Sequence, residues 1–130
     1  MRTINFRGQD IDDDEWLYGD LRQRLGYWPA IIESYCTDEG KVGYREIAVK
    51  EETVGQFTGL KDKNGRDIYE GDILRLKGER RKLEVCFVRG VFAFLWDGNL
   101  DDEFPCNAPT QEWAEVVGNI HDNPKMIKRR

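Results

Sequence analysis

The sequence GQFTGLKDKNGRDIYEGDIL, residues 55–74, is the most strongly patterned part of this 130-residue chain and decides its fold class. Two strand-like segments, FTGL and DIYEGDILRLK, flank the polar residues KDKNG. The dipeptide Asn64-Gly65 accepts positive φ at both central positions of a type I′ turn, so the stretch predicts a tight antiparallel hairpin. Gly59, Gly65 and Gly71 recur at intervals of six, where turns favour a residue without Cβ.

The same stretch also contains candidates for structural and binding roles. Asp72 begins the strand-like segment DILRL, a position where a carboxylate commonly accepts hydrogen bonds from the backbone N–H groups of a turn. The residues expected to shape the turns are Gly59, Asn64, Gly65, Gly71 and Asp72. A turn this specific can also form a protein-binding ridge, for which the candidates are Lys61, Asp62, Arg66, Tyr69 and Glu70.

The rest of the chain consists of short strand-like segments separated by Gly, Asp and Asn turns. The segment RQRLGYWP is interrupted by Gly26 and Pro29, so it predicts a loop that leads into the strand AIIESY. KLEVCFVR alternates as a strand, and EWAEVVGNI predicts a last strand. A short C-terminal helix follows, with Asn123 as its N-cap and Pro124 in its first position.

These segments predict a mainly antiparallel β protein with no β-α-β rhythm. The expected fold is a small Src-homology-3-like partly open barrel with an N-terminal β extension and a short C-terminal helix. We expect one domain, 1–130, in which 1–52 form the hairpin extension, 53–124 the barrel core and 125–130 a basic tail. Whether residues 20–50 form a separate lobe stays open.

Composition and charge exclude several classes of protein. The chain carries a net charge of −5, which argues against a dedicated DNA-backbone binder. No apolar run approaches the ~20 residues that span a bilayer, and the first residues lack the apolar stretch of a signal peptide, so we expect a cytoplasmic protein with no membrane partner. The three cysteines are far apart and form no C-x-x-C pair, which predicts reduced thiols.

No motif predicts a metal, a cofactor or a catalytic residue. In a calcium loop beginning at Asp62, Gly65 falls at the fourth position instead of the sixth, and a loop beginning at Asp97 lacks the required Gly and Glu. One histidine, His121, and scattered cysteines do not suggest zinc, and no glycine-rich phosphate loop is present. Paired carboxylates are numerous, but we expect most of them to lie in turns that are open to water.

Two basic clusters raise the possibility of nucleic-acid binding. They are residues 77–82, with Arg80, Arg81 and Lys82 as the candidate contacts, and residues 128–130. Nearby Phe87 and Phe92 could stack on bases. The acidity of the whole chain favours the simpler interpretation of a soluble turn and a solvated tail.

Residues 55–74, together with INFR (4–7), YGD (18–20) and VVGNIHDNP (116–124), closely resemble the YopX-like family of bacteriophage and prophage proteins. The matching segments occur in order along nearly the whole chain. The resemblance implies a small β-rich phage protein of unassigned activity, in the cytoplasm of a bacterial host cell. It supplies no catalytic residues.

Three functions follow as hypotheses. The leading one is a non-catalytic accessory protein that binds a host or phage protein through strand edges or exposed aromatic side chains. The alternatives are a nucleic-acid-binding accessory factor and an enzyme whose carboxylates converge only in the fold. Assembly into a homo-oligomer also stays open.

Overall fold

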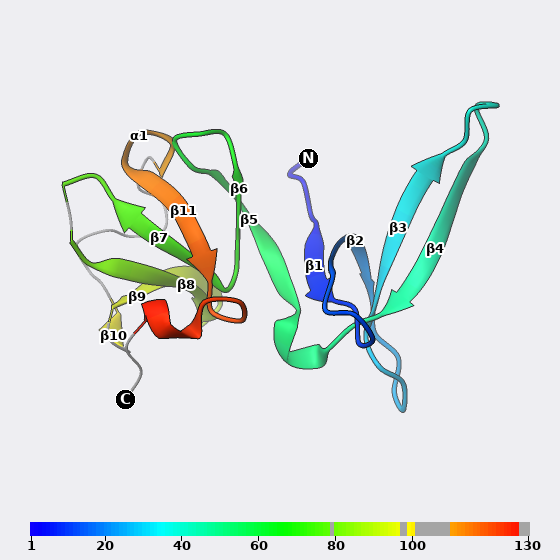
Figure 1. Ribbon diagram of the computed structural model, residues 1–130, viewed down its shortest axis with the longest axis horizontal. Helices are drawn as coiled ribbons and strands as arrows, with labels where there is room; N and C mark the ends of the chain where they lie inside the picture. Colours follow the sequence, from blue (N-terminus) through cyan, green and yellow to red (C-terminus); the bar gives the residue numbers. More distant parts are fainter. Residues whose placement is uncertain (79, 97–98, 101–109, 128–130) are drawn as a thin grey trace. The chain divides into compact units, whose positions relative to one another are not determined.

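A computed structural model describes residues 1–78, 80–96, 99–100 and 110–127, and it confirms a mainly-β protein of antiparallel strands (Figure 1). The chain divides into two compact units, Met1–Phe57 and Thr58–Arg130. Strand β5 (Gly55–Lys61) begins in the first unit and ends in the second. The described strands follow an open order in each sheet, so neither sheet closes into a barrel.

The first unit is an antiparallel sheet in the order β4-β3-β2-β1-β5. Its other elements are β1 (Phe6–Gln9), β2 (Trp16–Arg22), β3 (Ala30–Cys36), β4 (Val42–Ala48) and the 3-10 helix η1 (Glu51–Thr53). Leu17, Ile31 and Val49 form its buried core. Gly19 of β2 lies so close to β3 that an added Cβ would be 2.0 Å from the Ile32 carbonyl oxygen, so only glycine fits there.

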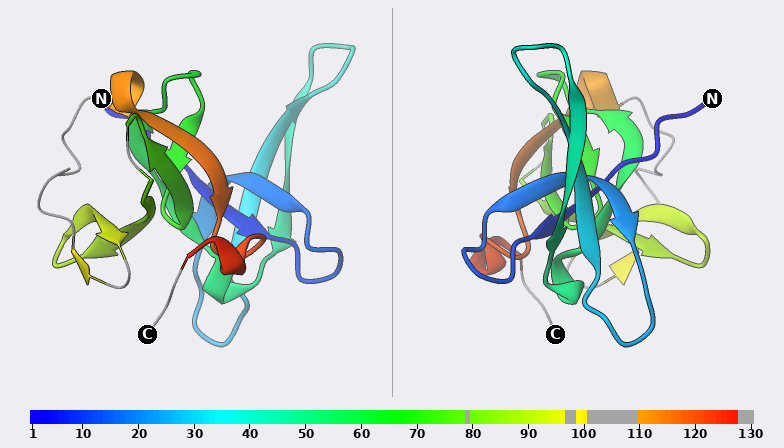
Figure 2. Two further views of the ribbon diagram at one scale, coloured as in Figure 1. Left: turned by 60° about the vertical axis from the view of Figure 1, so that its left-hand side comes forward. Right: turned by 90° about the vertical axis from the view of Figure 1, so that its right-hand side faces the viewer.

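The second unit contains an antiparallel sheet in the order β10-β9-β8-β7-β11, and β6 pairs with β5 (Figure 2). Its elements are β6 (Asp67–Tyr69), β7 (Asp72–Leu76), β8 (Lys82–Val88), β9 (Val91–Trp96), β10 (Asn99–Leu100), α1 (Thr110–Trp113), β11 (Ala114–Asn119) and the 3-10 helix η2 (Pro124–Met126). Inward-facing residues on alternate strand positions build one core, which comprises Ile68, Leu74, Leu76, Leu83, Val85, Phe94, Ala114 and Val116.

The turn at the centre of residues 55–74 is not the predicted type I′ turn. Gly65 has φ 80°, but Asn64 is absent from the non-glycine residues with positive φ. The Gly65 N–H donates to the Asp62 carbonyl at 3.0 Å, and the Asp62 N–H donates to the Arg66 carbonyl at 2.8 Å. This pattern is a three-residue loop, in which a type I turn is followed by a left-handed glycine.

The Asp62 carboxylate explains this choice of turn. Its Oδ1 accepts the N–H groups of Asn64 and Arg66, each at 2.9 Å, and its Oδ2 accepts the N–H of Val116 at 2.9 Å. The side chain is only 2% exposed. Burial alone would raise the pKa of Asp62, but the three N–H donors and the charge of Arg66 together lower it.

The predicted short C-terminal helix is a 3-10 helix, and the Asn123 side chain makes no cap hydrogen bond to it. Residues Pro124–Met126 form a single 3-10 turn with proline at its start, as expected. The Asn123 Oδ1 instead accepts the N–H of Asn119 at 3.2 Å. Asn119 Oδ1 accepts the N–H groups of His121 and Asp122, so the segment folds around local side-chain bonds and not around a helix cap.

Removal of the Asp62 carboxylate should destabilise the protein. Asp62→Ala leaves three backbone N–H groups without their acceptor, and we expect it to lower the free energy of unfolding by about 2–4 kcal/mol. Urea denaturation measures this change. The matched control is Asp67→Ala, which removes an exposed carboxylate paired with Lys61 and should cost no more than about 1 kcal/mol. Equal losses in the two variants would contradict the role assigned to Asp62.

The contribution of Asp62 should also depend on pH. Because the pKa of Asp62 is lower in the folded state than in the unfolded chain, its stabilisation is present above the unfolded value of about 4. It is lost as the pH falls through the folded value. The difference in unfolding free energy between the wild type and Asp62→Asn should therefore be constant from pH 5 to 7 and shrink below pH 4. A difference that grows on acidification would show the opposite pKa shift.

Candidate binding surface

The binding ridge predicted from residues 61–70 does not form as a continuous surface. Asp62 is 2% exposed, because its carboxylate accepts hydrogen bonds from the backbone. Tyr69 is 4% exposed and lies in the interior of the second unit. Lys61 and Arg66 are exposed, and Lys61 Nζ lies 2.5 Å from Asp67 Oδ1. A partner at this turn could therefore contact only part of the predicted set.

The remaining turn residues have structural positions. Gly59 and Gly71 have φ of 88° and 93°, which side chains with a Cβ rarely adopt. Asp72 Oδ2 accepts the Tyr69 N–H at 2.7 Å. Glu70 is half-buried. The glycines and Asp72 of this stretch therefore serve the turns between β5, β6 and β7.

The candidate nucleic-acid contacts lie where β7 turns into β8. The Arg81 guanidinium is 5.1 Å from the ring centroid of Trp96, an aromatic residue that sequence analysis did not pair with it. Phe87 and Phe92 instead pack edge to face with centroids 5.1 Å apart, near the other end of the β8–β9 hairpin. Residues 128–130 lie outside the described part of the chain.

Thiols and carboxylates do not gather into a site in the residues that the structure describes. No group of three or more His, Cys, Asp or Glu side chains in these ranges could hold a metal ion. Burial raises the pKa of the Cys86 thiol, and Glu84 and Glu70 raise it further, which disfavours the nucleophilic thiolate. Cys106 lies outside the described part of the chain. So does most of the acidic segment 97–103, of which only residues 99–100 are described.

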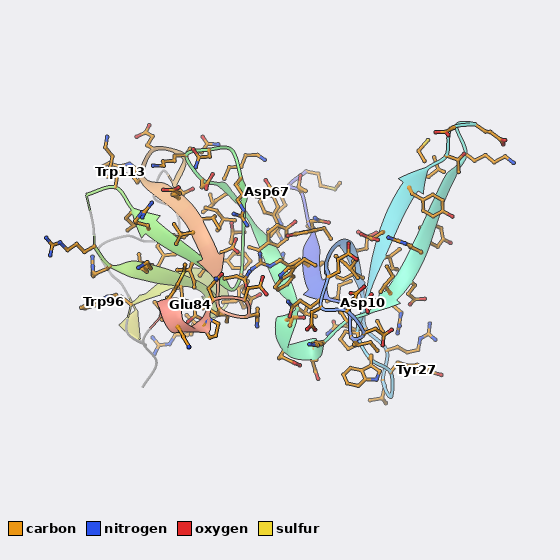
Figure 3. All side chains as sticks on the ribbon, in the orientation of Figure 1. Asp10, Tyr27, Asp67, Glu84, Trp96 and Trp113 are labelled. Carbon is orange, nitrogen blue, oxygen red and sulfur yellow. The ribbon has the colours of Figure 1, made fainter. Side chains whose placement is uncertain are left out.

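Three bulky apolar side chains project from the loop between β2 and β3, residues 23–29, which we call the β2–β3 loop. Leu25 is 99% exposed, Tyr27 64% and Trp28 59%. Figure 3 shows Tyr27 on this loop. Sequence analysis predicted the loop from Gly26 but did not identify these side chains as a site, although the cluster of Leu, Tyr and Trp beside Gly and Pro was the available signal.

Local interactions hold the β2–β3 loop in shape. Gly26 has φ 82°, and the Tyr27 N–H donates to the Arg24 carbonyl at 3.1 Å. The Arg24 guanidinium lies 5.1 Å from the centroid of the Tyr27 ring, within the range of a cation–π contact. Pro29 then leads into β3, where Ala30 and Ile31 are fully buried. The loop is therefore anchored in the core of the first unit at its β3 end.

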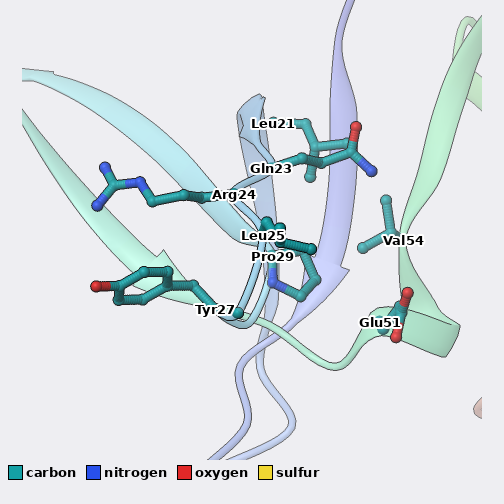
Figure 4. Close-up of a pocket in the computed structure, with 9 residues that line it drawn as sticks. Leu21, Gln23, Arg24, Leu25, Tyr27, Pro29, Glu51 and Val54 are labelled. Carbon is teal, nitrogen blue, oxygen red and sulfur yellow. The ribbon is translucent and has the colours of Figure 1, made fainter.

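A depression of about 700 Å³ lies between this loop and η1 (Figure 4). Its apolar lining comes from Leu21, Leu25, Pro29 and Val54, and its polar lining includes Gln23, Arg24 and Glu51. Figure 4 shows Arg24 and Tyr27 on one side and Glu51 on the other. The lining of this depression therefore mixes apolar side chains with charges of both signs.

The comparisons with known proteins agree with the family resemblance. The model of the YopX protein family matches residues 5–128. The chain belongs to the YopX family. The crystal structure of protein EF1440 from Enterococcus faecalis is similar to this YopX-family chain, with a TM-score of 0.60 and 26% sequence identity over 98% of this chain and 100% of that one. No curated protein matches the chain.

The helices of this YopX-family chain are short. Those in the described ranges contain three or four residues each, far fewer than the ~20 that a membrane crossing requires.

Proposed function

We propose that this chain is a non-catalytic accessory protein of a bacteriophage or prophage, which acts in the bacterial cytoplasm by binding another protein. The observation that supports this function best is the exposure of Leu25, Tyr27 and Trp28 on one loop. Monomeric soluble proteins rarely expose large apolar patches unless they bind something there. Tyr and Trp are also the residue types that most often dominate the binding energy of protein interfaces.

The charges of the first unit favour a particular kind of partner. Residues 1–57 contain twelve acidic and seven basic residues, whereas residues 58–130 contain thirteen of each. The net charge of −5 is therefore carried by the unit that contains the β2–β3 loop. A host or phage protein with a basic surface around an apolar anchor would be attracted to this unit and could place the anchor in the depression.

Exposed loop residues should control binding without controlling stability. We expect the double variant Leu25→Ser, Trp28→Ser to lose the partner that the wild type captures from infected or induced host cells. With the purified partner, its Kd should rise about 30-fold or more, as for hot-spot residues. The free energy of unfolding should change by less than about 1 kcal/mol, because both side chains already contact water.

The matched control for this experiment is Val91→Ser, which changes an apolar residue of β9 that is 59% exposed in the second unit. It should retain the partner with an unchanged Kd. Retention of the partner by the loop variant with wild-type affinity would refute the proposed site.

A nucleic-acid-binding function is the second candidate, because Arg81 and Trp96 lie together beside Arg80 and Lys82. If the chain is a protein-binding module, single-stranded DNA should bind weakly, and Arg80→Ala, Arg81→Ala, Lys82→Ala should not change its affinity. Fluorescence anisotropy between 50 and 200 mM salt provides the measurement. An affinity that falls steeply with salt and is lost in the triple variant, but not in Arg24→Ala, would favour the nucleic-acid function.

A further inference from the structure

The outer strand of the first unit has one unpaired edge. Among the strands that the structure describes, β4 has β3 on one side and no strand on the other. β2 pairs with β3 only at residues 30–32, so the outer halves of β3 and β4 form a two-stranded ribbon beyond it (Figure 2). Exposed edges of this kind can pair with a further strand through their backbone groups.

The hydrogen bonds at both ends of the ribbon show which backbone groups face outward. The Val49 N–H donates to the Pro29 carbonyl at 2.9 Å, and the Thr37 N–H donates to the Lys41 carbonyl at 2.8 Å. Directly opposed residues of an antiparallel pair alternate between hydrogen-bonded and non-hydrogen-bonded positions. Within the continuous β3–β4 register, odd-numbered residues of β4 therefore direct their backbone groups toward β3.

The even-numbered residues of β4 direct their N–H and C=O groups away from β3. One of them, Ala48, confirms this, because its carbonyl accepts the N–H of Ile11 at 3.3 Å from the outer side. The other three, Val42, Tyr44 and Glu46, are exposed and continue the same outer edge. Their three donors and three acceptors point to solvent in the described part of the chain.

We infer that this edge binds the β4 strand of a second copy of the chain, antiparallel about a twofold axis at Tyr44. In this register Tyr44 lies opposite Tyr44 of the second copy, and Val42 lies opposite Glu46. All three outward N–H groups of each copy then donate to outward carbonyls of the other. The interface is self-complementary, as a twofold dimer requires.

The side chains select this register over its neighbours. The two Tyr44 rings form a cross-strand aromatic pair. Gly43, over which the Tyr35 ring of the same copy lies, faces Arg45, whose guanidinium lies 2.8 Å from Glu33. Moving the axis to Arg45 would place two guanidinium groups opposite each other. Moving it to Gly43 would place Lys41 opposite Arg45. Only the axis at Tyr44 uses every outward group without opposing like charges.

Disulfide trapping tests this pairing residue by residue. Opposed residues of a hydrogen-bonded pair have Cα atoms about 5.5 Å apart, within the range of a disulfide. In a background with Cys36→Ser and Cys106→Ser, mild oxidation of Tyr44→Cys should give a covalent dimer on non-reducing gels. Val42→Cys and Glu46→Cys should each stay monomeric alone and should form a mixed dimer when combined. Equal trapping of all single variants, or no trapping of Tyr44→Cys, would overturn the inference.

A negative and a positive charge at position 42 should change the stability of the non-covalent dimer in opposite directions. Val42→Glu places a carboxylate opposite Glu46 twice in the dimer, and Val42→Lys places an ammonium there. Sedimentation equilibrium should show a dissociation constant about tenfold higher for Val42→Glu than for Val42→Lys. Equal constants would overturn the register.

A backbone variant separates a second copy from a different protein at the same edge. Tyr44→Pro removes an outward N–H but no bond to β3, so the ribbon should keep its circular dichroism and stability while the dimer is lost. A wild-type chain that remains monomeric at 1 mM would overturn the inference. Loss of a different protein by Tyr44→Pro, with the wild-type chain monomeric, would assign the edge to that protein instead.

Discussion

A buried carboxylate connects two parts of the second unit that lie far apart in the sequence. Asp62 holds the turn between β5 and β6 and also binds Val116 of β11, which is 54 positions away in the chain. A buried carboxylate is costly unless hydrogen bonds replace its lost hydration. Here three backbone N–H groups do so, and each of them needs an acceptor in turn. The turn between β5 and β6 and the strand β11 therefore hold each other in place. The second unit depends on these hydrogen bonds between the Asp62 carboxylate and the backbone.

The residues that hold the fold together are different from the residues of the two candidate binding surfaces. The patterned stretch, residues 55–74, supplies turns, core residues and the Asp62 contacts. The β2–β3 loop and the edge of β4 instead lie in residues 23–48, outside that stretch. Loops and edges on a rigid sheet can vary without loss of the fold. The most strongly patterned stretch of the chain thus builds a scaffold.

Strand alternation and turn residues were enough to predict a mainly antiparallel β protein, but long-range contacts decided its details. The type I′ turn was wrong because Asp62 binds Asn64 and Val116 at the same time, which the local sequence does not reveal. Tyr69 was predicted to lie on the surface, but tertiary packing buries it. Trp96 lies beside Arg81 only because of the β8–β9 pairing. The β2–β3 loop was predicted from the sequence. The exposure of its apolar side chains was not, because it depends on whether the core of the first unit has room to bury them.

The loop and the edge of the first unit would bind the proposed partners through different interactions. Leu25, Tyr27 and Trp28 offer apolar area, which gives affinity with little directional preference. The edge of β4 offers fixed donors and acceptors, which set register and orientation. The two are joined by β3, which begins directly after the loop and pairs with β4 along its length. A twofold dimer through β4 would present two copies of the loop to one target. Binding of the second loop would then become intramolecular, so two weak contacts would act as one stronger contact wherever the target displays paired sites at the matching separation.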